Sequence, residues 1–197
     1  MTQPQNDADP LRAVGGALAN WSLVELELAS LFSILAGIPN QKKAYAAFDV
    51  IVSFEVRVAI CDRLMAFEEV EEVEAEMWNR LSAKLSASYK KRHQLAHFVV
   101  FHDDSGAVAI SPFYTWTKFA EGTDKKLSTK EIRERSAKFI ELHKAINWFT
   151  SQKIRRLASN QPDPLPDLPE PSLVPRLRAS AIQILEAKKQ TPSVDLD

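Results

Sequence analysis

Apolar side chains recur every three or four residues along most of the chain, and this spacing predicts amphipathic helices. The first helix is expected over residues 10–36. Asp9 and Pro10 suit its N-cap and first helical position, and Gly37 suits the residue after its last turn. A single carboxylate interrupts its apolar stripe, which consists of Val14, Leu18, Trp21, Glu25, Leu28, Phe32 and Leu35. A stripe of this length predicts a helix that packs against other helices.

Two more helices follow, and they differ in how much of their surface is apolar. The second is expected over residues 41–67 and is apolar almost all round, which predicts burial on most of its sides. The third is expected over residues 70–96 and has one apolar face, on which Trp78 and Leu85 are followed by Arg92. The apolar face that is expected to pack in the core therefore has a positively charged residue, Arg92, at its C-terminal end.

The period of the pattern changes after the third helix. Residues 98–101 and 107–110 are β-prone and flank a turn sequence at 103–106, so they predict a β-hairpin. Residues 113–119 are expected to extend it as a third strand. The helical pattern returns over residues 128–158, where the fourth helix opens with the Ser-x-x-Glu spacing of a capping box.

Proline ends the helical pattern. Five prolines fall within a short stretch, at Pro162, Pro164, Pro166, Pro169 and Pro171. Residues 159–172 are therefore expected to form an extended linker, and residues 173–197 a short amphipathic helix and a tail. Residues 1–9 are expected to be a disordered N-terminus. The predicted architecture is all-α: a four-helix bundle over residues 10–158, with a small β-hairpin insertion between its third and fourth helices.

Composition narrows the class of protein. The 197 residues are 45% hydrophobic and 26% charged, which suits one globular core. The one cysteine, Cys61, excludes an internal disulfide and a metal site made of several cysteines. No apolar run reaches the length that a bilayer requires, and the polar, acidic N-terminus does not resemble a signal sequence. We therefore expect a bacterial-type cytoplasmic protein with no membrane partner.

Charge is segregated along the chain, although the net charge is only −1. Residues 1–79 contain 13 acidic and 5 basic residues, a balance of −8. Residues 80–100 contain 5 basic residues and no acidic one, and residues 125–156 contain 10 basic and 3 acidic ones, which gives balances of +5 and +7. Basic helix faces are most often simply solvated, and cations near a helix C-terminus complement its dipole. The same basic segments also suit a phosphate-binding site.

The candidate chemistry lies at the end of the third helix, at Lys90, Lys91, Arg92, His93 and His97. A guanidinium binds a phosphate through two parallel hydrogen bonds, and an imidazole exchanges a proton near neutral pH. In this interpretation Arg92 binds the scissile phosphate of RNA, the two lysines hold phosphate, and His97 moves a proton with the support of His93. The reaction leaves a 2′,3′-cyclic phosphate and needs no metal or cofactor. It needs both an acid and a base, so we expect a second copy of the chain to complete the site.

Helical periodicity directs Arg92 toward the bundle, where an unpaired charge is costly. Glu25 lies in the middle of the first apolar stripe, and Arg57 is embedded in the second helix. We therefore expect a structural polar network of Glu25, Arg57 and Arg92 inside the bundle or at its rim. A purely structural interpretation stays open, in which Arg92 pairs with Glu25 and His97 caps the third helix.

Three short patterns occur in an order that is known from one superfamily. They are Trp21-x-x-Val24-Glu25-x-x-Leu28, Phe54-x-x-Arg57 and Arg92-His93-x-x-x-His97, in the first, second and third predicted helices. With them the chain resembles bacterial domains of the HEPN superfamily over roughly residues 10–158, and many members of that superfamily are metal-independent ribonucleases. The resemblance implies that Arg92 and His97 are the functional pair and that His93 occupies the variable polar position.

Three hypotheses about function remain open at this stage. The resemblance implies a homodimer that binds RNA or a nucleotide, and that acts as an endoribonuclease if it belongs to the active members. The alternative is a non-catalytic dimeric scaffold, whose linker and C-terminal helix bind a protein partner. A metal site at His93 and His97 is disfavoured, because it lacks a third ligand and the glutamate of a His-Glu-x-x-His motif.

Overall fold

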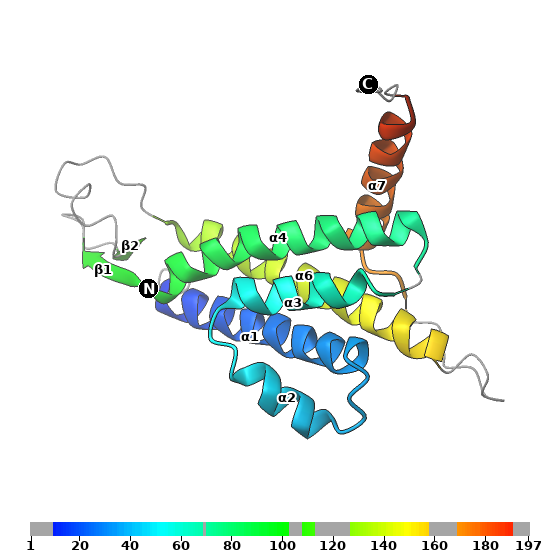
Figure 1. The fold of residues 1–197 in the computed structure, drawn as a ribbon. Coiled ribbons are helices and arrows are strands. Elements are labelled where there is room, and N and C mark those ends of the chain that lie inside the picture. Colours follow the sequence, from blue (N-terminus) through cyan, green and yellow to red (C-terminus); the bar gives the residue numbers. More distant parts are fainter. Residues whose placement is uncertain (1–9, 69, 103–107, 113–126, 158–168, 191–197) are drawn as a thin grey trace, which may run out of the picture. The chain divides into compact units, whose positions relative to one another are not determined.

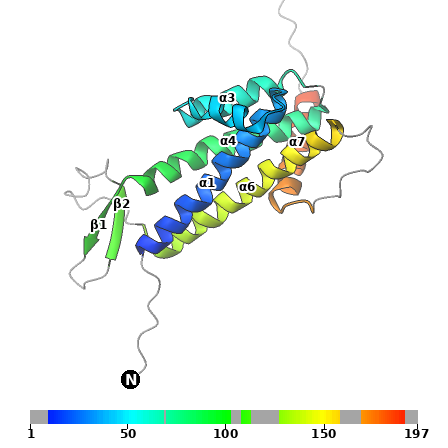
Figure 2. The same cartoon turned by 90° about the horizontal axis from the view of Figure 1, so that it is seen from below.

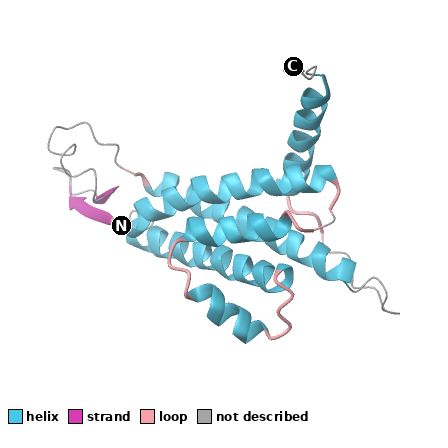
Figure 3. Cartoon of the chain, in the orientation of Figure 1, coloured by secondary structure: helices cyan, strands magenta, loops and turns pink. Residues whose placement is uncertain are grey.

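Helices make up most of the part of the chain that the structure describes (Figure 1). The structure is a computed structural model, and the described residues are 10–68, 70–102, 108–112, 127–157 and 169–190. In chain order the elements are α1 (Pro10–Leu35), α2 (Gln41–Asp49), α3 (Phe54–Met65), α4 (Glu72–Ala96), β1 (Phe98–His102), β2 (Val108–Pro112), α6 (Thr129–Leu157) and α7 (Leu173–Gln190). Apart from the two short strands (Figure 3), these elements are helices, and the predicted all-α class is confirmed.

The chain divides into two compact units. The first contains residues 1–26 and 87–143, and the second contains residues 27–86 and 144–197. The long continuous helices α1, α4 and α6 (Figure 2) contribute residues to both units, whereas α2, α3 and α7 lie wholly in the second. Each unit contains a buried tryptophan.

Trp21 is the buried tryptophan of the first unit. Its fully buried ring packs edge-on against Phe139 of α6, with 5.1 Å between the ring centroids and 73° between the planes. The Tyr89 ring of α4 lies 6.1 Å from the Trp21 ring. The indole N–H donates a 2.9 Å hydrogen bond to Glu25, one turn further along α1. Because its ring is buried and its N–H has a partner, Trp21 joins three helices at little polar cost.

Trp78 has the same role in the second unit. Its indole N–H donates to Asp62 of α3 at 2.8 Å, and its ring lies 5.9 Å from the Phe149 ring of α6. The helix α7 begins at Leu173, as the apolar spacing predicts. It adds an apolar face to this unit, because its buried residues are Leu173, Val174, Leu177, Ala181 and Leu185.

Local sequence fixes two helix ends as predicted. After α1, Gly37 adopts a φ of 62°, its N–H donates to the Ile34 carbonyl, and the next N–H donates to the Ser33 carbonyl. This arrangement is a Schellman motif, which glycine permits because it has no Cβ. Before α6, a Glu131 carboxylate oxygen accepts the Ser128 N–H at 3.0 Å, and the Ser128 hydroxyl accepts the Glu131 N–H at 3.2 Å. The predicted capping box is therefore confirmed.

The single helix predicted over residues 41–67 is wrong, because the chain forms two helices there. Residues 50–53 separate α2 from α3, and they contain three β-branched side chains that favour extended backbone. The Ser53 hydroxyl accepts the Val56 N–H at 3.3 Å and caps α3, and Asn40 caps α2 in the same way. The burial predicted on most sides is also wrong, since α2 and α3 each bury only some of their side chains.

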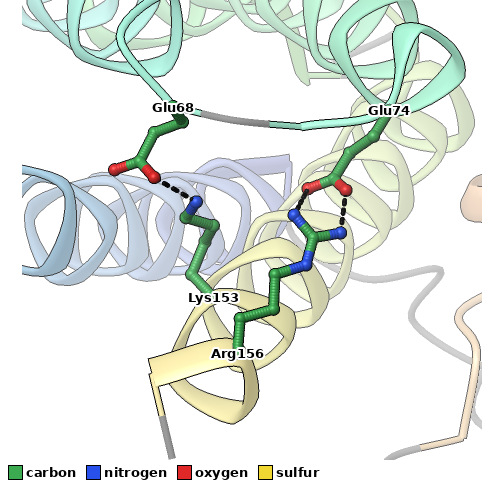
Figure 4. Close-up of polar contacts among 4 residues, drawn as sticks. All are labelled: Glu68, Glu74, Lys153 and Arg156. Carbon is green, nitrogen blue, oxygen red and sulfur yellow. Dashed lines mark hydrogen bonds and ion pairs between the residues drawn. The ribbon is translucent and has the colours of Figure 1, made fainter. Parts of the chain in front are cut away.

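Two ion pairs in the second unit hold the last turns of α6 (Figure 4). The Lys153 ammonium donates to Glu68, which follows α3, and the Arg156 guanidinium binds Glu74 of α4 through two nitrogens. Lys153 is only 5% exposed, so its charge depends on that carboxylate.

The strands β1 and β2 pair in antiparallel fashion. Their register places Phe98 opposite Pro112 and His102 opposite Val108. In sequence they lie between α4 and α6, where the pattern predicts a hairpin. The predicted turn at 103–106 and the predicted third strand at 113–119 lie outside the described residues.

Two glycine substitutions should change stability in opposite directions. Gly37→Ala should lower the free energy of unfolding by about 1–2 kcal/mol, because a Cβ disfavours its left-handed backbone. Gly15→Ala should raise it by about 0.5–1 kcal/mol, because this helical glycine has open space where a Cβ would lie. Denaturant unfolding followed by circular dichroism measures both changes. Equal effects of the two variants would contradict the assignment of Gly37 as a helix cap.

The buried ion pair should respond differently to removal of its two members. Glu68→Gln should lower the free energy of unfolding by about 1–2 kcal/mol, because it leaves a buried ammonium without a counter-charge. Lys153→Met should cost less, since the Glu68 side chain is 31% exposed and water can solvate it. The same unfolding experiment tests this order, and a larger loss for Lys153→Met would show that packing of the lysine stem dominates.

Candidate functional site

The last turns of α4 carry the residues that the sequence singles out. Leu85 and Leu95 are fully buried, and their burial fixes how the helix is rotated. Lys90 and Lys91 are exposed, whereas Arg92 is half-buried. Arg92 therefore lies at the edge of the buried face, between the core and solvent.

Two imidazoles lie side by side at this end of α4. The ring centroids of His93 and His97 are 4.4 Å apart, their planes are inclined by 52°, and both side chains are exposed. The His97 N–H donates to the His93 carbonyl at 3.1 Å, so helical hydrogen bonding continues one residue beyond Ala96. Residues four positions apart share a helix face, and this places both rings on the same side. A ligand that approaches this side would meet two proton-exchanging groups.

Arg92 does not share a helix face with His97. Five positions along an α-helix correspond to a rotation of about 140°. The described contacts join His97 to His93, whereas the Arg92 Nε is buried and has no hydrogen-bond partner among the described residues. An unsatisfied buried donor is costly, and a guanidinium in this state is a natural place for an anionic ligand or partner.

The polar network predicted for Glu25, Arg57 and Arg92 is not found among the described residues. Glu25 accepts a hydrogen bond from the buried indole one turn earlier in α1. The Arg57 Nε donates to the Ile51 carbonyl at 2.7 Å, and a terminal nitrogen lies 3.8 Å from the Asp49 carboxylate. Both charges thus find partners within a few residues. The structural pairing of Arg92 with Glu25 is likewise not found among the described residues.

One polar contact beside the site was not predicted. The Gln94 side-chain oxygen accepts a 2.9 Å hydrogen bond from Arg135 of α6, and both side chains are half-buried. Arg135 therefore brings a cation from α6 to a residue that lies between His93 and His97 in sequence. The two residues are 41 positions apart, and neither stands out in its own helix, so local pattern gave no signal for this contact.

No metal centre is apparent at this end of α4. Among the residues that the structure describes, no group of three or more histidine, cysteine, aspartate or glutamate side chains is placed to hold an ion. His93 and His97 remain a pair. The site offers cations and imidazoles, which suit a phosphate better than a metal.

Cys61 does not provide an alternative nucleophile. The thiol is buried in α3, and burial, followed by the nearby Asp62 carboxylate, raises its pKa to about 12. Burial also raises the pKa of Asp62. The hydrogen bonds that its carboxylate accepts from Trp78 and Ser82 lower this pKa, but by less. A thiol with so high a pKa is protonated at neutral pH and unreactive.

Comparison with models of protein families, with curated proteins and with solved structures gave no match for the chain. One described helix, α1, is long and apolar enough to cross a membrane. Of its most apolar stretch, 39% is buried in the structure, and core helices of soluble proteins and signal sequences meet the same criteria of length and composition.

The Cys61 thiol should react very slowly in the folded protein. A rise in pKa from 9.0 to about 12 lowers the thiolate fraction near pH 8 by a factor of several hundred. A chromogenic disulfide reagent should therefore modify the native protein at least about 100-fold more slowly than the same protein in denaturant. Equal rates in the two states would mean that α3 opens readily or that the thiol is not buried.

Proposed function

We propose that the protein is a HEPN-like, homodimeric, metal-independent endoribonuclease that binds RNA at the end of α4. The observation that carries the proposal is the exposed pair of imidazoles, His93 and His97, with 4.4 Å between ring centroids and with Arg92 beside them in sequence. RNA cleavage needs one group that removes a proton and one that supplies a proton, and imidazole performs both roles near neutral pH.

The chemistry is a transfer within the substrate. The ribose 2′-oxygen attacks the adjacent phosphorus as one imidazole removes its proton, and the bond from phosphorus to the 5′-oxygen breaks as an acid protonates that oxygen. The products are a 2′,3′-cyclic phosphate and a 5′-hydroxyl. We assign the base or acid role to His97 and its support to His93, whose ring contacts it. A second copy of the chain would supply the complementary group.

The cations serve binding and charge stabilisation. Arg92 is only half-buried, so its exposed part is available to a phosphate, and its buried Nε has no hydrogen-bond partner among the described residues. A preorganised guanidinium stabilises the charge that develops on phosphate oxygens. Lys90 and Lys91 are exposed on the same turn and would hold neighbouring phosphates. Residues 80–100 contain no acidic side chain that would repel RNA.

The exposed side of α1 supports the homodimer. In the first unit, Leu11, Leu23 and Leu26 are 40–48% exposed. Exposed apolar surface of this kind is typical of association sites.

The rival scaffold hypothesis loses part of its basis. It requires the C-terminal helix to offer its apolar side to a partner. In the structure the apolar residues of α7, among them Val174, Leu177 and Ala181, are already buried within the second unit. A partner would have to displace α7 before it could bind that side.

RNA cleavage by the purified protein tests the proposal. The wild-type chain should cleave single-stranded RNA in the presence of EDTA and leave 2′,3′-cyclic phosphate ends, and His97→Ala should lower the rate roughly 10²–10⁴-fold. The melting temperature should change little, because His97 is exposed. His143→Gln, an imidazole of α6 outside the site, is the matched control and should retain the wild-type rate.

Two further measurements separate cleavage from contamination and from binding. A substrate with a 2′-deoxy sugar at the cleaved position should resist cleavage, because it lacks the nucleophile. The His97→Ala variant should still bind RNA, because Arg92, Lys90 and Lys91 remain. Its affinity for RNA should fall steeply as the salt concentration rises from about 50 to about 200 mM. Equal cleavage by wild type and His97→Ala would identify a contaminating nuclease and overturn the assignment.

A further inference from the structure

A groove in the second unit is lined by a carboxylate, whereas the α4 site contains cations. It encloses about 530 Å³ and is lined by the end of α1, the turn that follows, the start of α2 and the second half of α6. This volume lies in the range of small-molecule sites. The polar lining residues of the groove are Glu27, Ser30, Ser33, Gln41, Asn147, Thr150 and Ser151.

Three hydroxyls of the groove have already used their protons. Ser33 donates to the Ile38 carbonyl at 3.3 Å, Thr150 donates to the carbonyl one turn earlier at 3.0 Å, and Ser151 does the same at 2.8 Å. A hydroxyl has one proton and two lone pairs. With the proton committed to the backbone, each oxygen can only accept hydrogen bonds from a ligand.

Glu27 adds a negative charge to these acceptors. It is half-buried and is the one charged side chain of the groove lining. Among the described residues, no cation pairs with its carboxylate and no donor is bonded to it. A partly buried carboxylate gains most from a ligand that brings both positive charge and N–H donors. The groove therefore selects against phosphates and other anions.

Apolar side chains form the rest of the wall. Ile34 faces the groove from α1, and Ile154 and Leu157 line it from the last turns of α6. The two residues of α6 are 39% and 74% exposed, which is high for aliphatic side chains of a helix that otherwise buries its apolar positions. An aliphatic ligand segment would cover them and remove this surface from water.

We propose that this groove binds an aliphatic polyamine. One ammonium lies at Glu27, the methylene chain covers Ile154 and Leu157, and the other amino groups donate to the hydroxyl oxygens of Ser33, Thr150 and Ser151. A primary amine has three donors and no acceptor, so it complements the acceptors that Glu27 and the three hydroxyls offer. The inference does not depend on the proposed ribonuclease activity, because the residues of the groove all belong to the second unit.

Calorimetric titration of the full chain tests the proposal with four probes of defined charge. Spermidine and 1,4-diaminobutane should bind at one site. The neutral isostere 1,4-butanediol and the anion succinate should give no measurable binding. Binding of the diol as tightly as the diamine would overturn the proposal, because charge would then not be recognised.

Three variants locate the site. Glu27→Gln keeps the shape and removes the charge, so it should weaken diamine binding about tenfold or more. Ser151→Leu should fill the groove and abolish binding. Glu186→Gln, an exposed carboxylate of α7 outside the groove, is the matched control and should bind as the wild type does.

Two outcomes would refute the proposal. If Glu27→Gln and Glu186→Gln weaken binding equally, the amines bind to general negative charge and not to this groove. If no variant and no wild-type sample binds spermidine, the groove has another role. The melting temperature of each variant, measured without ligand, confirms that a loss of binding is not a loss of folding.

Discussion

The burial of one apolar face of α4 determines what the rest of the molecule can present at its candidate site. Leu81, Leu85 and Leu95 are fully buried, and together they fix the rotation of the helix about its axis. With that rotation set, His93 and His97 must face solvent, and Arg92 must lie at the boundary of the core. No separate loop or strand is needed to expose the imidazoles. The directions of the site residues are therefore a consequence of how the apolar face of the same helix packs.

Sequence pattern predicted the features that depend on neighbours along the chain. Gly37 could be assigned as a helix end and Ser128 as a cap, because both motifs are completed within a few residues. The shared face of His93 and His97 follows from a spacing of four. The break at residues 50–53 was missed, although its β-branched run and the Ser53 cap are local, because the continuous apolar pattern outweighed them.

Contacts between distant segments were much harder to predict. The network of Glu25, Arg57 and Arg92 was inferred from the need to pair buried charges, but local groups satisfied Glu25 and Arg57 first. The contact of Gln94 with Arg135 and the groove between α1 and α6 depend on residues that are far apart in sequence. The sequence shows which charged and polar side chains are available for pairing, but only the fold determines which of them come into contact.

A helix dipole explains part of the charge at the end of α4 but not all of it. Lys90 and Lys91 lie before the last turn of α4, within reach of a weaker part of its dipole, and as exposed side chains they need no ligand to account for them. The dipole does not require a cation to be half-buried with a nitrogen that has no partner in the described part of the chain, as is the case for the Arg92 Nε. Nor does it require two aromatic titratable rings to be in contact and exposed. The first of these features lowers the stability of the fold and the second adds little to it. Both would be explained by a phosphate ligand that binds there.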